Sequence, residues 1–98
     1  MPWIMHGYNG NIQITEQLAK WGIFFSFGKS LFNENSKSVE SLRYLPLEKI
    51  FLETDEFEGE IEQIYEKAAS LKSISVEVLK TEVRNNFSRI ESSFIERF

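Results

Sequence analysis

Three short stretches of the chain are rich in aromatic and β-branched residues, and each of them predicts a β-strand. They are Trp3–Met5, Ile23–Phe27 and Lys49–Thr54. The second and third are almost continuously apolar. They lack the alternation of apolar and polar residues that is typical of a strand with one solvent-exposed face. This pattern is typical of strands covered on both faces, as in a parallel sheet.

Apolar residues that recur every three or four positions predict helices between these strands. The first helix runs from about Ile12 to Trp21, with Asn11 as its N-cap and Gly22 as its stop. A second, short and mostly polar helix is expected over Ser36–Tyr44, at the surface of the protein.

Two further helices are predicted after the third strand, over Glu60–Lys72 and over Val76–Phe94. Ser75 is placed to cap the last helix, which we expect to fray beyond Ile90. The order of elements is strand, helix, strand, helix, strand, helix, helix, which is typical of right-handed parallel βαβ units. The predicted fold class is therefore α/β, with about three βα units and two open sheet edges.

The composition narrows the classes of protein to which the chain can belong. Its 98 residues, with 42% hydrophobic and 14% aromatic residues, suit one folded domain or a piece of one. The absence of cysteine excludes disulfides, zinc–thiolate sites and thiol catalysis, and favours the cytoplasm. We expect no transmembrane segment or signal peptide. The net charge of −4 disfavours a non-catalytic nucleic-acid-binding module.

The candidate chemistry lies after the first and third predicted strands. His6 follows one of them and Asp55 follows the other, so both are expected at the carboxyl ends of the strands, where α/β barrels carry their active sites. Imidazole and carboxylate are ligands of divalent cations that activate water. Spacing alone leaves the alternatives open, because a turn histidine and a capping aspartate are more frequent.

Three segments taken together resemble the C-terminal part of the TatD-type metal-dependent hydrolases. They are His6–Gly10, Phe25–Phe27 and the run Pro46–Asp55, which contains Glu-Thr-Asp after an apolar strand. Ile74–Glu77 and Asn86–Ile90 resemble the closing helix of that family. The resemblance implies a TIM-like (β/α)₈ barrel of the amidohydrolase type, in which the three strands here are strands six, seven and eight.

The resemblance also implies an activity and a set of site residues. The activity is hydrolysis of phosphodiester bonds in DNA, or in another phosphodiester, with Mg²⁺ or alternatively Mn²⁺ or Zn²⁺. His6 and Asp55 are then metal ligands, and Asp55 is also catalytic because it contacts the attacking water. Asn9 is a candidate phosphate donor or a turn residue, and Lys29 a candidate phosphate contact or an ordinary surface lysine.

Two features of the sequence depart from the family pattern. Asp55 is followed by Glu56 and Phe57, where the family commonly has a small residue and proline, and six acidic residues fall between Glu53 and Glu62. We interpret this stretch as a solvated loop and helix start, with a carboxylate of Glu56 near the metal as the alternative. The two tryptophans, Trp3 and Trp21, are interpreted as packing residues and not as base-stacking ones.

Part of the family's site has no counterpart in this chain. The His-x-His of the first barrel strand, a bridging glutamate and a further histidine all precede this region in the family. We therefore expect residues 1–98 to be one C-terminal segment that is inactive alone and active with the missing N-terminal part of the barrel. The alternative is a non-catalytic α/β fragment that self-associates through its open sheet edges and binds no metal tightly.

Overall fold

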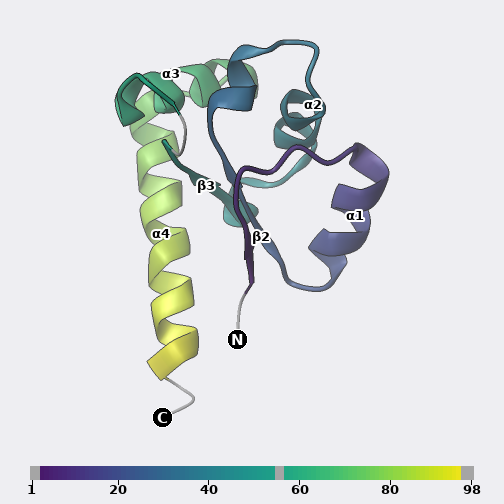
Figure 1. The fold of residues 1–98 in the computed structure, drawn as a ribbon. Coiled ribbons are helices and arrows are strands. Elements are labelled where there is room, and N and C mark those ends of the chain that lie inside the picture. Colours follow the sequence, from purple (N-terminus) through teal and green to yellow (C-terminus); the bar gives the residue numbers. More distant parts are fainter. Residues whose placement is uncertain (1–2, 55–56, 96–98) are drawn as a thin grey trace.

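The protein folds around a three-stranded parallel sheet, seen in a computed structural model that describes residues 3–54 and 57–95 (Figure 1). The strands are β1 (Ile4–Met5), β2 (Phe24–Phe27) and β3 (Ile50–Leu52). Their order in the sheet is β1-β2-β3, and both neighbouring pairs are parallel. The prediction of an α/β fold with parallel strands is confirmed.

Helices follow each strand in the described part of the chain. The α-helices are α1 (Ile12–Lys20), α2 (Lys37–Tyr44), α3 (Ile61–Lys72) and α4 (Val76–Ile95), and two 3₁₀ helices are η1 (Lys29–Phe32) and η2 (Leu47–Lys49). In Figure 1, α4 runs alongside β3, and α1 and α2 lie beyond the other two strands. None of the helices among the described residues is both long and apolar enough to cross a membrane.

Both predicted N-caps are present. The side-chain oxygen of Asn11 accepts a hydrogen bond of 2.9 Å from the backbone N–H of Ile14. The hydroxyl of Ser75 accepts one of 3.1 Å from the N–H of Val78. The last helix differs from the prediction, because α4 continues to Ile95 instead of fraying beyond Ile90. No glycine or proline interrupts residues 76–95, so the helical hydrogen bonds continue.

The main core lies between the helices and one face of the sheet. The register pairs Phe25 with Ile50 and Phe27 with Leu52, so these side chains share one face, here called the outer face. Phe25, Phe27 and Ile50 are fully buried there. Fully buried side chains from α2, α3 and α4 complete the core: Leu42, Ile64 and Leu79.

The short helix α2 packs more deeply than a surface helix, which corrects the prediction. Val39 and Leu42 are buried, and so are the small residues Ser38 and Ser41. The hydroxyl of Ser41 donates a 2.7 Å hydrogen bond to the carbonyl oxygen of Gly10. Serine side chains are small and find local partners, so this apparently polar helix can approach the loop after β1 closely.

Lys72 of α3 joins that helix to the end of α2. Its ammonium donates to the carbonyl oxygens of Leu42 at 2.9 Å and Leu45 at 2.5 Å. Burial lowers the pKa of Lys72 below its usual value of 10.5, while the negative charge of Glu48 opposes that effect. The contact satisfies carbonyl groups that the end of a helix otherwise leaves without partners.

The interpretation of both tryptophans as packing residues is wrong. Trp3 is 72% exposed and Trp21 is 81% exposed. Trp3 immediately precedes the edge strand β1, and Trp21 caps the carboxyl end of α1. Both belong to the β1–α1 end of the sheet, where neither side chain is covered by the described part of the chain.

The opposite end of the sheet is covered by α4. Asn86 is fully buried, and its side-chain amide donates 2.8 Å hydrogen bonds to the carbonyl oxygens of Leu47 and Ile50. Next to it, the ring of Phe87 packs edge-on against Phe51, with 4.8 Å between ring centroids. The last helix is therefore anchored to β3 by polar and aromatic contacts together.

Candidate functional site

The residues after the strands converge on one face of the sheet. The register places Ser26 opposite Phe51, and residues alternate between faces along a strand. Phe24, Ser26, Phe51 and Glu53 therefore share the face opposite the main core, here called the inner face. Because all three strands are parallel, the residues that follow them lie at the same edge of the sheet.

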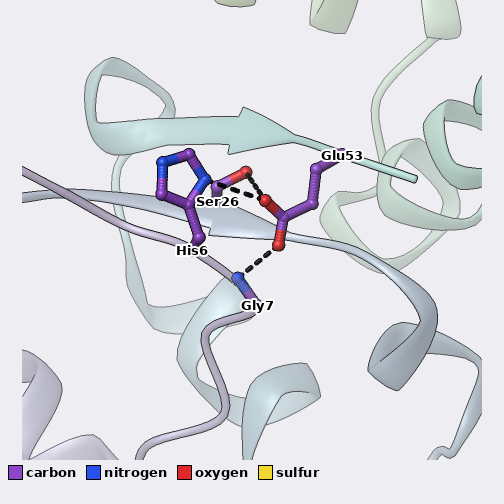
Figure 2. Close-up of polar contacts among 4 residues, drawn as sticks. All are labelled: His6, Gly7, Ser26 and Glu53. Carbon is purple, nitrogen blue, oxygen red and sulfur yellow. Dashed lines mark hydrogen bonds and ion pairs between the residues drawn. The ribbon is translucent and has the colours of Figure 1, made fainter. Parts of the chain in front are cut away.

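The carboxylate of Glu53 is the centre of the site (Figure 2). Its Oε2 lies 3.0 Å from Nδ1 of His6 and accepts a 3.0 Å hydrogen bond from the hydroxyl of Ser26. Its Oε1 accepts a hydrogen bond from the backbone N–H of Gly7. The side chain of Glu53 is 13% exposed and that of His6 is 68% exposed. One carboxylate thus joins residues that follow or belong to all three strands.

The backbone of Gly7 turns the chain between His6 and Tyr8. Gly7 has a φ of 57°, a conformation that residues with a side chain adopt at a cost. Tyr8 therefore enters the main core, where its ring packs edge-on against Phe25 at 4.7 Å between centroids. His6 stays at the inner face with Glu53.

A buried hydrogen-bond network holds the loop that follows His6. The hydroxyl of Tyr8 lies 2.7 Å from that of Thr15, which lies 2.8 Å from the hydroxyl of Ser41. The side-chain oxygen of Asn9 accepts a 2.8 Å hydrogen bond from the backbone N–H of Ser38. These contacts fix the loop against α1 and α2, and they support the turn-stabilising interpretation of Asn9.

His6, Asn9 and Lys29 line one cavity of about 600 Å³, with Glu53 beside them. Gly7, Gly28 and Ser30 complete its lining. Three of the four residues singled out from the sequence are thus brought together, and their roles stay predictions. Asp55 and its neighbour Glu56 lie outside the described residues.

The groups at this edge can supply part of a metal site. Among residues 3–54 and 57–95, no three acidic, histidine or cysteine side chains are grouped so that they could hold an ion. A histidine whose Nδ1–H donates a hydrogen bond to a carboxylate can ligate a metal ion through Nε2. This is the usual arrangement of metal-bound histidine. His6 fits a ligand role in that respect, and a cation here needs further ligands beyond this set.

Glu53 is not among the site residues predicted from the sequence. In the sequence it is the first member of an acidic segment. A usable signal was present, because residues 51 and 53 follow the two-residue period of a strand and therefore share a face. Strand alternation thus marks Glu53 for the face that carries His6.

Comparisons with known proteins agree with this architecture. Residues 1–92 match the family described as TatD related DNase. No curated protein sequence matches the chain significantly. Among solved structures, the crystal structure of YjjV, a TatD homolog from Escherichia coli K12, is similar with a TM-score of 0.74 and 22% sequence identity.

The similarity to YjjV covers 85% of this chain and 38% of the YjjV chain. This chain thus spans well under half the length of that neighbour, with the parallel strands and helices of the same fold. The match of the family over nearly the whole sequence shows that this chain belongs to the TatD related DNase family.

Proposed function

We propose that the chain forms part of a metal-dependent hydrolase that cleaves phosphodiester bonds in DNA. The observation that carries this proposal is the placement of His6, the chain's one histidine, beside Glu53 at the carboxyl-terminal edge of a parallel sheet. Catalytic groups of α/β barrels lie at this edge. Membership of the TatD related DNase family supports the reaction class.

His6 and Asp55 are the proposed ligands of a divalent cation, with Mg²⁺ preferred and Mn²⁺ or Zn²⁺ as alternatives. The cation supplies positive charge that stabilises the developing negative charge on the phosphate and makes a water molecule easier to deprotonate. Asp55 would accept a proton from the attacking water as the oxygen of that water bonds to phosphorus. The bond from phosphorus to the leaving oxygen breaks, and the leaving oxygen takes a proton from solvent. Glu53 is held by its three partners and is assigned no proton transfer.

Two residues of the cavity are proposed to contact the substrate. Lys29 belongs to η1, directly after β2, and lines the cavity together with His6. Its positive charge can attract a phosphate in a chain whose net charge is −4. Asn9 uses its side-chain oxygen to hold Ser38, so only its amide group is proposed to donate to a phosphate oxygen.

The remaining ligands are proposed to come from the missing N-terminal part of the barrel. This proposal rests on the 38% of the YjjV chain that the structural similarity covers. It also agrees with the described residues, in which no three acidic, histidine or cysteine side chains are grouped around a common point. The 98-residue chain alone is therefore expected to be inactive, and residues 1–98 act as one C-terminal segment of a composite site.

A chimera tests the proposed function. The chain is fused to the N-terminal part of the YjjV barrel, purified, and checked for folding and for bound Mn²⁺. We expect the folded, Mn²⁺-loaded chimera to cleave plasmid DNA, and the Asp55→Asn and His6→Ala variants to lose at least about a hundredfold in rate. Glu66→Gln, an exposed change on α3, is the matched control and retains activity.

Two outcomes contradict parts of this proposal. A folded, metal-loaded chimera that cleaves neither DNA nor a small phosphodiester overturns the assigned reaction. Cleavage by the unfused 98-residue chain, lost in its Asp55→Asn variant, overturns the need for an N-terminal part.

A second candidate function is a self-associating α/β fragment that binds no metal tightly. The observations in its favour are the exposure of Trp3, which precedes the edge strand β1, and the exposure of Ile14 and Trp21 around one hollow on α1. Exposed apolar groups beside an open strand edge favour association. A molecular mass that rises with protein concentration in light scattering, with no thermal shift on adding Mn²⁺, supports this candidate over the first.

A further inference from the structure

We propose that Glu53 is a positioning residue that selects the tautomer of His6. In this assignment the proton of the neutral imidazole sits on Nδ1, and the lone pair of Nε2 faces away from Glu53 toward the cavity. The importance of Nε2 for a metal or substrate rests on the proposed function. The choice of tautomer rests on the hydrogen bonds alone.

The first step is the orientation of the carboxylate. The backbone N–H of Gly7 can only donate, so the atom at the Oε1 position must accept. The hydroxyl of Ser26 donates to Oε2, and Ser26 is 3% exposed. Both oxygens of an ionised carboxylate are acceptors, so the 3.0 Å contact with His6 requires Nδ1 to carry the proton.

The second step is the close fit around Glu53. A Cβ atom placed on Gly28 would lie 3.0 Å from the carbonyl oxygen of Glu53 and 3.3 Å from its Cγ. The N–H of Glu53 also donates a 2.9 Å hydrogen bond to the carbonyl oxygen of Phe27. The backbone of Glu53 is thus held against the end of β2, and its side chain is held by Gly7 and Ser26.

The consequence for His6 concerns its second ring nitrogen. A neutral imidazole carries one proton, so a proton on Nδ1 leaves Nε2 with a free lone pair. Figure 2 shows that this nitrogen lies on the side of the ring away from Glu53. His6 lines the 600 Å³ cavity, so the lone pair is available to a cation or a donor group there.

The variant Glu53→Gln should invert this arrangement. The N–H of Gly7 still needs an acceptor, so the amide oxygen of glutamine takes the Oε1 position. Its NH₂ group then takes the Oε2 position and donates to Nδ1 of His6, while the hydroxyl of Ser26 rotates to accept. The proton of His6 therefore moves to Nε2, at nearly unchanged side-chain volume.

Nuclear magnetic resonance can measure the tautomer directly, because the chain has a single histidine. The 98-residue protein is labelled with ¹⁵N-histidine and studied without metal or DNA, at about pH 8.5, so that the neutral imidazole is observed. The one-bond and two-bond ¹H–¹⁵N correlations identify the protonated nitrogen. We expect Nδ1–H to dominate in the wild type and Nε2–H to dominate in Glu53→Gln.

Glu66→Gln removes the same charge from an exposed position on α3 and should keep the wild-type tautomer. A wild-type protein with Nε2–H as the main form overturns the proposal, and so does a folded Glu53→Gln variant that keeps Nδ1–H. If Glu53→Gln does not fold, the wild-type spectrum decides, together with Ser26→Ala, which keeps the carboxylate and is expected to keep Nδ1–H.

The outcome is independent of the proposed hydrolase function. An Nδ1–H tautomer in a chain whose chimera never cleaves DNA leaves this inference standing and overturns the function. DNA cleavage by the chimera, together with an Nε2–H tautomer in the wild type, leaves the proposed function standing and overturns this inference.

Discussion

His6 and Glu53 are hydrogen-bonded across an intervening strand. They are 47 residues apart in sequence and follow β1 and β3, the two edge strands of the sheet. Even so, Nδ1 of His6 and Oε2 of Glu53 lie 3.0 Å apart. Two strand spacings amount to about 10 Å at the backbone. The long glutamate side chain is therefore part of what spans the gap over β2, and Ser26 of that middle strand supports it.

Gly28 should be required for this geometry. A Cβ atom there would press on the backbone and Cγ of Glu53 at 3.0 and 3.3 Å. We expect Gly28→Ala to push the end of β3 away from β2, to lower the free energy of unfolding by about 1–3 kcal/mol and to shift the imidazole resonances of His6. Urea unfolding and the ¹⁵N-histidine spectrum measure the two effects.

Gly22→Ala is the matched control for this change. Gly22 has a φ of 76°, so alanine is strained there, but a Cβ atom would meet no other group within 4 Å. It should lower stability by about 1–2 kcal/mol and leave the His6 resonances unchanged. Equal His6 spectra for both alanine variants would contradict the role given to Gly28.

Asn86 should be the main polar anchor of α4. It is fully buried and donates to the carbonyl oxygens of Leu47 in η2 and Ile50 in β3, at 2.8 Å each. Asn86→Ala leaves these acceptors without their donor, and we expect a loss of about 2–3 kcal/mol in the free energy of unfolding. The measurement is urea unfolding followed by circular dichroism.

The neighbouring Asn85 provides the comparison, because it is exposed on the same helix. Asn85→Ala should change stability by no more than about 0.5 kcal/mol. A similar loss in both variants would show that the helix, and not the two hydrogen bonds, determines the effect.

Much of the fold could be predicted from local patterns. The apolar strands, the caps Asn11 and Ser75, and the parallel arrangement all follow from short segments of sequence. Whether Trp3 and Trp21 are buried or exposed could not be predicted this way. An apolar stripe shows which face of an element prefers cover, while the cover itself depends on whatever packs beside it.

The site was predictable only in part. The position of His6 follows from one strand end, which is a local feature. The role of Glu53 depends on the register of three strands and on the positive φ of Gly7, which are properties of the folded chain. An acidic run from residue 53 to residue 62 also makes one carboxylate difficult to single out.

The exposed apolar residues Ile14 and Trp21 of α1 and its C-cap yield a prediction about self-association. Ile14 is 52% exposed and Trp21 is 81% exposed, and both line a cavity of about 160 Å³ on the helix surface. If this surface drives self-association, the double variant Ile14→Gln, Trp21→Gln should lower the concentration-dependent rise in mass, because it removes apolar area from the contact. Its free energy of unfolding should change by about 0.5 kcal/mol or less per site, since exposed side chains contribute little.

Val78→Gln, at a 47% exposed position on α4, is the control and should leave the association unchanged. A wild-type chain that stays monomeric at every concentration in light scattering contradicts association through this surface and favours the composite barrel.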